Sequence, residues 1–327
     1  MKIATIGTGV IVDAFLSGLN KIKDTECVAM YSRKEETAKP LAAKYGIPTI
    51  YTDLNAMYAD PTIEFIYVAS PNSLHFEHAY RALEHGKHVI CEKPFTSTLK
   101  ETDTLISLAK QKNLMLFEAI TTIHLPNYQL IKENIEKLGQ IKLVQCNYSQ
   151  YSSKYNALLA GETPNVFSPK FSGGSLVDIN IYNLHFVMNL FGTPKKISYS
   201  ANKHTNGIDT SGVLVMEYPE FIAECVGAKD TRSMNFVLIQ GEKGYIHVEN
   251  GANGCRQIVL HSGESEVILN SQTSMNNLYY ELVVFNKIFK TKDFNQCYKL
   301  LDYSRSVMEI LVNARKDANI IFDADEM

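Results

Sequence analysis

A carboxylate, an amine and a proline follow a short apolar run in the first third of the chain. The run is Val89-Ile90-Cys91, and Glu92, Lys93 and Pro94 come directly after it. The ring of Pro94 disfavours a helical conformation for Lys93, so the pair should leave a buried strand in an extended conformation. Strand ends of this kind bind ligands in open α/β sheets, and a partly buried lysine can exchange protons near neutral pH. The alternative interpretation is a solvent-exposed Glu–Lys pair.

A second group of polar side chains interrupts an otherwise apolar segment, residues 175–190. Asp178, Tyr182, His185 and Asn189 are spaced i, i+4, i+7 and i+11, which places them on one face of a helix. The helix is apolar nearly all round elsewhere, so it should be mostly buried. The polar face is either a narrow solvent stripe or the wall of a cleft. In a cleft, these groups would orient a substrate hydroxyl and relay its proton.

A glycine turn, Gly7-Thr8-Gly9, joins an apolar strand over residues 2–6 to a helical segment from Asp13. Glycines let the backbone approach a pyrophosphate, and the N-terminus of the following helix supplies N–H donors. The order of strand, glycine turn and helix at the start of a βαβ unit predicts a dinucleotide site, where a lone glycine pair would not.

The end of the second strand, residues 26–31, indicates which dinucleotide binds. Ser32-Arg33-Lys34 follows it, with no carboxylate before Glu35. An acidic residue there would hold the ribose hydroxyls of NAD, whereas arginine would accept the 2′-phosphate of NADP. The sequence therefore favours NADP(H) over NAD(H). The Ser32–Glu35 spacing also predicts a capping box at the start of the next helix.

The elements that position these residues fall into two halves. Strands alternate with helices through residue 118, which is typical of βαβ units in a parallel sheet. From residue 195 to about 269 successive strands are joined by short turns, which predicts an antiparallel sheet. We therefore expect an α/β dinucleotide-binding domain over residues 1–122 and an α+β domain over residues 123–327.

Composition limits the possible partners and locations. The net charge is −3 without a basic block, which argues against nucleic acid, and no apolar run approaches the roughly 20 residues of a membrane span. The N-terminus enters a strand at once and lacks the pattern of a signal peptide. The six cysteines are scattered without a CxxC pair, as expected for reduced thiols in a cytoplasmic protein. His75 and His78 form a possible metal pair, but no third ligand has suitable spacing, so we expect no metal.

Five segments, in this order and at these spacings, resemble the Gfo/Idh/MocA family, which includes glucose–fructose oxidoreductase, inositol dehydrogenase and dihydrodiol dehydrogenase. The resemblance covers the whole chain. The segments are Gly7-Thr8-Gly9, Ala69-Ser70-Pro71-Asn72-Ser73-Leu74-His75, Glu92-Lys93-Pro94, Phe117-Glu118-Ala119 and Gly173-Gly174-Ser175-Leu176-Val177-Asp178-Ile179-Asn180-Ile181-Tyr182.

The resemblance implies a Rossmann domain followed by an α+β domain with a large, mostly antiparallel open sheet, through which dimers or tetramers form. It also implies hydride transfer between NAD(P) and a sugar, polyol or related alcohol or carbonyl compound. The implied catalytic residues are Lys93, Asp178 and Tyr182. We expect His124 and His185 to face the substrate. The expected cofactor-binding residues are Gly7, Thr8, Gly9, Val10, Ile11, Ser32, Arg33, Ala69, Ser70, Asn72, His75, Glu92 and Lys93.

The chain departs from the family pattern in three places. Val12 replaces the usual alanine or glycine, and Asn180 stands where this branch commonly has glycine. Thr121 and Ile123 replace a tryptophan and an arginine that the resemblance places near the nicotinamide and the substrate. An NAD(P)-dependent oxidoreductase is the leading hypothesis. The alternative is a non-catalytic NAD(P)- or sugar-sensing regulator on the same scaffold, although a sensor has no need of a proton relay.

Arg33 provides a test of the predicted cofactor. A charged hydrogen bond to the 2′-phosphate contributes about 1.5–3 kcal/mol. Arg33→Ala should therefore weaken NADPH binding roughly ten- to a hundredfold and leave NADH binding nearly unchanged, as measured by fluorescence titration. An equal loss for both cofactors would rule out a phosphate contact.

Overall fold

The computed structural model of the protein describes residues 1–326 and divides the chain into two compact units. Unit 1 comprises Met1–Ala119 and Ser274–Arg305, and unit 2 comprises Ile120–Thr273 and the residues from Ser306 onward. The sequence-based division instead assigned every residue after 122 to the second domain. Ser274–Arg305 belongs to unit 1 because Leu282 and Phe285 are buried in its apolar core. Periodicity shows that a helix has a buried face, but it does not show which core buries that face.

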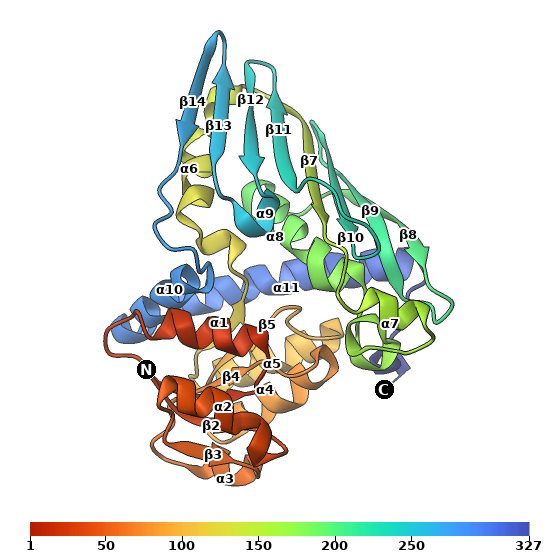
Figure 1. The fold of residues 1–327 in the computed structure, drawn as a ribbon. Helices are drawn as coiled ribbons and strands as arrows, with labels where there is room; N and C mark the ends of the chain where they lie inside the picture. The colour runs from red at the N-terminus through yellow and green to blue at the C-terminus, as the bar shows by residue number, and fades with distance from the viewer. Residues whose placement is uncertain (327) are drawn as a thin grey trace. The chain divides into compact units, whose positions relative to one another are not determined.

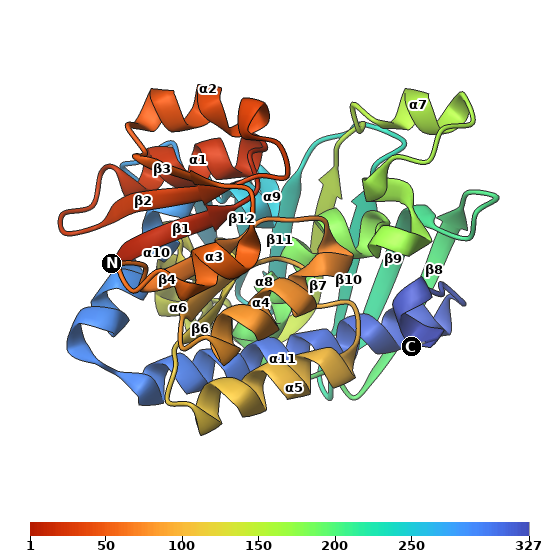
Figure 2. The same ribbon diagram turned by 90° about the horizontal axis from the view of Figure 1, so that it is seen from below.

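Unit 1 is built on a six-stranded parallel sheet. Its strands are β1 (Lys2–Ile6), β2 (Glu26–Tyr31), β3 (Thr49–Tyr51), β4 (Phe65–Val68), β5 (His88–Glu92) and β6 (Leu116–Ala119). Its helices are α1 (Val10–Leu19), α2 (Glu35–Tyr45), α3 (Leu54–Ala59), α4 (His75–Glu84), α5 (Leu99–Gln111), α10 (Leu278–Thr291) and the first part of α11 (Phe294–Asp317) (Figure 1). Figure 2 shows α1 and α2 along one face of the sheet and α4 and α5 along the other.

The strand order is β3-β2-β1-β4-β5-β6, so the direction of chain progression reverses between β1 and β4. Ligands of open α/β sheets bind at such a reversal, outside the carboxyl ends of the strands. All four residues of β4 are buried, as expected where helices cover both faces. The loops after β1, β4 and β5 therefore share the edge at which a dinucleotide is expected.

The capping box predicted for α2 is wrong, whereas α5 has one. The Thr98 hydroxyl accepts from the amide of Glu101, whose carboxylate accepts from the amide of Thr98, so α5 has a capping box. At α2 the N-cap position is occupied by Lys34. The Ser32 hydroxyl instead accepts from the amide of Lys34 and pairs with the Thr37 hydroxyl. The Ser-x-x-Glu spacing fits either arrangement, because serine also stabilises local turns outside a helix.

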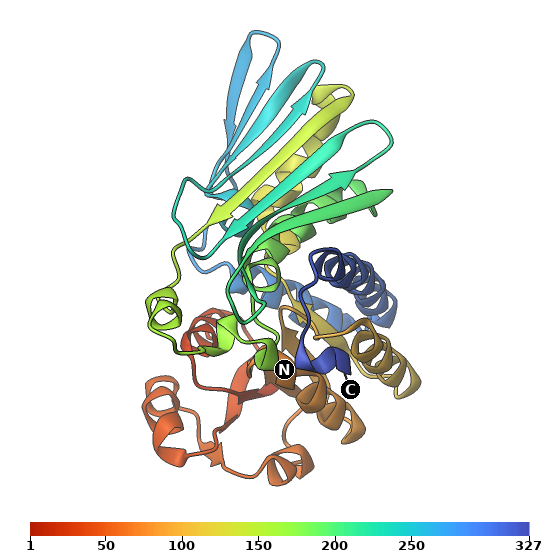
Figure 3. The same ribbon diagram turned by 90° about the vertical axis from the view of Figure 1, so that its right-hand side faces the viewer.

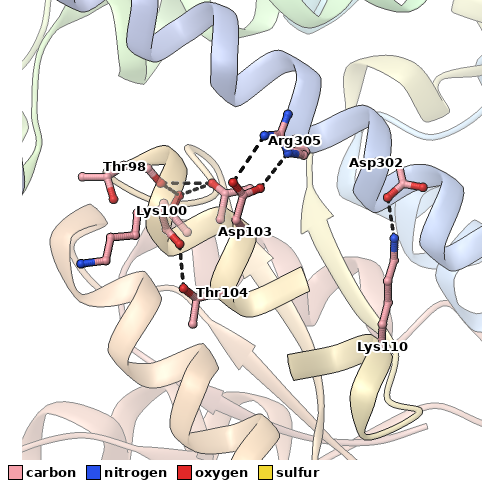
Figure 4. A network of polar contacts seen from close by, with 9 residues as sticks. Thr98, Lys100, Asp103, Thr104, Lys110, Asp302 and Arg305 are labelled. Atoms are coloured by element: carbon pink, nitrogen blue, oxygen red, sulfur yellow. Dashed lines mark hydrogen bonds and ion pairs between the residues drawn. The ribbon is translucent and has the colours of Figure 1, made fainter. Parts of the chain in front are cut away.

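Two ion pairs within unit 1 connect α5 to the first part of α11 (Figure 4). Arg305 donates to Asp103 at 2.7 Å, and Lys110 donates to Asp302 at 2.6 Å. These side chains are partly exposed, so each pair contributes only about 0–1 kcal/mol. They set the register of the two helices, while buried side chains such as Cys297 provide most of the stability.

Unit 2 is built on an eight-stranded sheet in the order β14-β13-β12-β11-β7-β10-β9-β8. Its strands are β7 (Ile141–Ser149), β8 (Lys196–Lys203), β9 (Asp209–Glu217), β10 (Ile222–Ala228), β11 (Phe236–Gly241), β12 (Gly244–Glu249), β13 (Ile258–Ser262) and β14 (Ser265–Leu269). Its helices are α6 (Pro126–Asn134), α7 (Tyr155–Leu159), α8 (Ile181–Phe191) and α9 (Gly251–Gly254). β7 pairs with β10 in parallel and with β11 in antiparallel, and the other neighbours are antiparallel. The predicted fold class is confirmed.

Helices cover one face of this sheet, and Figure 3 shows its other face without a helical layer. The segment 152–172 contains α7 and short 3₁₀ turns at Asn165–Phe167 and Pro169–Phe171. The predicted helix over 175–190 is modified. Leu176–Asn180 forms a π-helical turn, and α8 follows it. A π turn inserts one extra residue, so side chains before and after it lose the α-helical angular relation.

A buried carboxylate holds the start of the π turn. Asp209 accepts from the amide of Leu176 at 2.6 Å and from the Tyr199 hydroxyl at 2.7 Å, and burial raises its pKa to about 6. Gly174 precedes the turn with φ +125°, and a Cβ there would overlap Asp209 Oδ1. Glycine is therefore required by both the backbone conformation and the carboxylate beside it.

Within residues 1–326, no helix is long and apolar enough to cross a lipid bilayer. The same residues contain no group of three or more His, Cys, Asp and Glu side chains arranged to hold a metal ion.

Candidate active site

The first turn of unit 1 brings its backbone against the end of β4. Gly7 has φ +119°, and a Cβ there would lie 2.7 Å from the Ala69 carbonyl oxygen. At Gly9 a Cβ would meet no atom within 4 Å. The turn is therefore closed on its inner side and open at Gly9, next to Thr8. This combination fits the close approach of a pyrophosphate to the backbone.

Helix α1 presents its N-terminus at the same turn. Gly9 is its N-cap residue and supplies no side-chain acceptor. Val10 is 88% exposed and Ile11 is partly exposed, whereas Val12 is fully buried. The first amides of a helix have no intrahelical acceptor, and the helix dipole favours an anion there. The residues of this turn thus fit the phosphates of a dinucleotide.

The predicted cofactor-selecting residues lie after β2. The amide of Ser32 donates to the Tyr51 carbonyl oxygen at 3.1 Å, which ties the start of the segment to β3. Arg33 and Lys34 are exposed. Neither forms an ion pair with a carboxylate of the described chain, whereas Glu35 pairs with Lys39 at 3.2 Å. The Arg33 guanidinium therefore has the exposure that a contact with a ribose phosphate would need.

His75 links the loops that follow β4 and β5. Its Nδ1 lies 2.9 Å from the Pro94 carbonyl oxygen, and its Nε2 lies 3.0 Å from that of Ser70. The Ser70 hydroxyl also contacts His78 Nδ1 at 3.0 Å. Burial lowers the pKa of His75 to about 4, although both carbonyl oxygens favour its protonation. At neutral pH the uncharged ring can donate to only one of these two carbonyl oxygens, and it lies between the residue after Lys93 and the β4 loop. Asn72 lies in the 3₁₀ turn of that loop.

Glu92 and Lys93 differ sharply in exposure. Glu92 is buried and accepts from the Tyr67 hydroxyl at 2.6 Å, and the Tyr67 ring stacks on Phe15 with centroids 3.6 Å apart. Burial raises the pKa of Glu92, which the phenol bond partly offsets. Lys93 is partly exposed, and its peptide to Pro94 is cis. The strand end thus buries the carboxylate of Glu92 and leaves Lys93 only partly exposed, contrary to the exposed-pair interpretation.

Two further acidic residues of unit 1 are buried, and neither was predicted as a site residue. Glu118 lies on β6 and Glu281 lies on α10. Burial raises the pKa of Glu281 well above its usual value, and the charges of Glu92 and Glu118 add to this effect. One feature of the sequence could have indicated that Glu281 is buried. It is a lone carboxylate four residues before Phe285, on the apolar face of its helix. Its proximity to the β5 end requires the tertiary structure.

In unit 2, Asp178 forms an ion pair with Lys229. Asp178 lies on the π turn and is 29% exposed, whereas the Lys229 side chain, directly after β10, is 5% exposed. The Lys229 ammonium also lies 5.1 Å from the centroid of the Phe167 ring. Sequence analysis did not identify Lys229. The pair holds the carboxylate at a defined place beside the end of the sheet.

The predicted polar face of the next helix is not uniform. Tyr182 and Asn189 are partly exposed, but His185 is completely buried. The Tyr182 ring lies 5.9 Å from the ring of Tyr148, at the end of β7. His124 is partly buried, and burial together with the charge of His185 lowers its pKa to about 3. Complete burial of His185 means that it would meet a substrate only through other side chains.

Asn180, one of the departures from the family pattern, has a structural role. Its amide donates to the Cys225 carbonyl oxygen at 2.9 Å and accepts from Asn183 at 2.9 Å. Asn183 in turn donates to the Val226 carbonyl oxygen. A Cβ on Gly227 would lie 2.6 Å from that of Asn180. The asparagine thus anchors the π turn to β10. Thr121 and Ile123 are both buried.

Comparison with known proteins identifies the family. Residues 1–120 match the family model of the oxidoreductase family with an NAD-binding Rossmann fold, and residues 128–247 match the GFO/IDH/MocA C-terminal domain. The chain belongs to the GFO/IDH/MocA oxidoreductase family. The predicted family and the predicted NAD(P)-dependent oxidoreductase are confirmed.

Two members of the GFO/IDH/MocA family illustrate the range of relatives. The chain is 34% identical to scyllo-inositol 2-dehydrogenase (NADP(+)) of Bacillus subtilis, over all of this chain and 99% of that protein. It is 25% identical to trans-1,2-dihydrobenzene-1,2-diol dehydrogenase of Sus scrofa, over 98% of each. A 3-ketoreductase from Actinomadura kijaniata, solved with NADP and TDP-benzene, shares the fold with a TM-score of 0.84 over 97% of each chain at 18% identity.

The structure brings together most of the predicted cofactor residues along one sheet edge of unit 1. Asp178, Tyr182, His124 and His185 belong to unit 2. The expected catalytic cooperation of Lys93 with Asp178 and Tyr182 joins residues of both units and stays a prediction.

The buried histidine brace predicts a pH dependence of stability. His75 has a pKa of about 4 in the folded protein and 6.5 as its usual value, so the unfolded chain binds a proton first as pH falls. Its contribution to stability is therefore complete above pH 6.5 and is lost progressively as pH falls toward 4. Between pH 7.5 and 5 this loss amounts to about 2 kcal/mol for one histidine.

The measurement is the free energy of unfolding in urea at both pH values, for wild type and His75→Gln. The variant should be less stable at pH 7.5 but lose about 2 kcal/mol less on acidification. The same burial effect acts on His78 and His88, so a smaller pH dependence should persist in the variant. Identical pH dependence in both proteins would contradict the assignment.

Proposed function

We propose that the protein is an NADP(H)-dependent dehydrogenase or reductase that acts on a sugar, polyol or related alcohol or carbonyl compound. The observation that carries this proposal is the edge of the parallel sheet in unit 1. There, an open glycine turn and a helix N-terminus share one edge with the partly exposed Lys93. Relatives named for inositol and dihydrodiol oxidation support the substrate class.

The residues of unit 1 fit a bound NADP(H). The Gly7–Gly9 turn and the start of α1 would hold the pyrophosphate, and the exposed Arg33 would hold the 2′-phosphate. The loop braced by His75 and the end of β5 would contact the nicotinamide half. The NADP(+) in the name of the Bacillus relative supports this preference. When bound, the nicotinamide supplies or accepts the hydride.

The chain's own residues handle the proton and the orientation of the substrate. Oxidation of an alcohol releases its hydroxyl proton, and reduction of a carbonyl returns one. We assign this transfer to the amine of Lys93, a partly exposed residue directly after the strand end. Asp178, held by Lys229, and Tyr182 would orient the reacting oxygen. His124 and His185 would shape the substrate side of unit 2.

Replacement of Lys93 tests the assignment. General acid–base catalysis contributes about 10²–10⁴-fold, so Lys93→Ala should lower kcat by that factor while NADPH still binds. Tyr182→Phe should cost less, because it removes only an orienting hydrogen bond. The assay is a dehydrogenase and reductase screen over aldoses, polyols, inositols and dicarbonyls with both cofactors.

Normal turnover of Lys93→Ala with an inactive Tyr182→Phe would reverse the two roles. The enzymatic proposal would fail if the screen finds no substrate and neither Lys93→Ala nor Tyr182→Phe has an effect. The protein would then be a sensor of NAD(P) or a sugar.

We also propose a cytoplasmic homodimer or homotetramer joined through the eight-stranded sheet. The location is supported by six free cysteines, five of them buried. The assembly is supported by apolar side chains on the sheet face without a helical layer. Val213 and Val226 are neighbours on this face, and Val215 and Leu238 are likewise only partly buried. An apolar sheet face needs cover, which a second copy would provide.

Light scattering at micromolar concentration tests the assembly. We expect the mass of two or four chains, and Val226→Lys should shift the distribution toward one chain because a charge would then face the interface. A wild-type mass of one chain contradicts the proposal.

A further inference from the structure

A polar pocket of about 700 Å³ lies in unit 2, where β7, β11 and α9 come together. This volume is within the range of small-molecule binding sites. Its lining includes Tyr148, Gln150, Arg232, Ser233, Asn235 and Asn253.

The lining has a distinctive chemistry. Its side chains are amides, hydroxyls and phenols, and Arg232 is the charged group among the residues that line it in the described chain. The Tyr148 hydroxyl donates to Gln150 at 3.0 Å and accepts from Asn253 at 3.1 Å. Such groups suit a ligand rich in hydroxyls. The cation without an acidic partner in the lining suits a negatively charged group on that ligand.

The loop that carries Arg232 is fixed at the residues that follow Arg232. Buried Asn147 donates to the Ser233 hydroxyl at 2.9 Å, and Asn235 accepts from the amide of Ser149 at 2.9 Å. The Arg232 backbone is thus held by β7 while its side chain stays exposed. A guanidinium on a fixed backbone loses less conformational freedom when it binds an anion.

The pocket adjoins the residues of unit 2 that we assign to the substrate. The Tyr148 ring, which lines the pocket, lies 5.9 Å from that of Tyr182. Lys229, the ion-pair partner of Asp178, begins the loop that leads to Arg232. A ligand whose reacting alcohol meets Asp178 and Tyr182 can therefore extend into the pocket past Tyr148.

We propose that this pocket binds the distal part of an extended polyol substrate, and that Arg232 selects substrates whose distal part carries an oxyanion. This inference rests on the proposed function for the reacting end of the substrate. Arginine forms two parallel hydrogen bonds with a carboxylate or a phosphate, which a neutral hydroxyl cannot match. The amides and the phenol bind the hydroxyl groups between the two ends.

The test compares D-glucose, D-glucuronate and D-glucose 6-phosphate, three ligands that differ in the group at one end. Wild type should show a higher kcat/KM for at least one anionic sugar. Arg232→Gln should lower that kcat/KM about ten- to a hundredfold and leave the values for D-glucose and for NADPH binding unchanged. Arg232→Lys should restore part of the loss. Lys170→Gln, an exposed lysine of unit 2 outside the pocket, controls for a general change of charge.

D-glucuronate and D-glucose 6-phosphate distinguish a carboxylate site from a phosphate site. The anionic sugar whose kcat/KM falls in Arg232→Gln carries the group that Arg232 binds. Equal effects of Arg232→Gln on all three sugars, or the same loss in Lys170→Gln, would overturn the proposal.

Calorimetric binding of the same sugars to the NADP(+)-loaded protein separates this inference from the proposed function. Binding of an anionic sugar that depends on Arg232, without turnover, would support the pocket and refute the hydride transfer. Turnover of neutral sugars with no binding of either anionic sugar would support the hydride transfer and refute the proposed role of the pocket.

Discussion

Parallel strands that end at one edge are the constraint on which unit 1 depends. The turns after β1 and β4 meet where the strand order reverses, and Gly7 lies against the Ala69 carbonyl there. β5 ends beside them, so its terminal Glu92 and the following Lys93 reach the same edge. No contact between side chains is needed to bring these groups together. The register of the ladder does so, and His75 then fixes the loops.

Buried ionisable groups are concentrated around this edge and at the start of the π turn. Removing a carboxylate from water is unfavourable unless hydrogen bonds replace its hydration. The Tyr67 hydroxyl does this for Glu92, and the Leu176 amide with the Tyr199 hydroxyl does it for Asp209. Such groups are more sensitive to their surroundings than exposed ones, and pKa values shifted by burial cluster at functional sites.

In unit 2, a π turn positions the polar groups. The π turn is held by Asp209 at its start and anchored to β10 by Asn180. It carries Asp178 to Lys229 at the end of the sheet. Gly174 and Gly227 are glycines because a Cβ at either would overlap the side chain beside it. π turns inside helices are often found at functional sites, and this one carries a proposed catalytic residue.

The alternation of strands and helices, the glycine turn, the lysine at a strand end and the family could all be predicted from the sequence. These follow from local periodicity and from residues adjacent in the chain. Tertiary structure alone decided that α10 packs in unit 1 and that Lys229 pairs with Asp178. It also decided that His185 is buried and that Ser32 does not cap α2. The first three depend on contacts between segments that are distant in the chain, and Ser32 has a choice between two local hydrogen-bond arrangements that fit the same spacing.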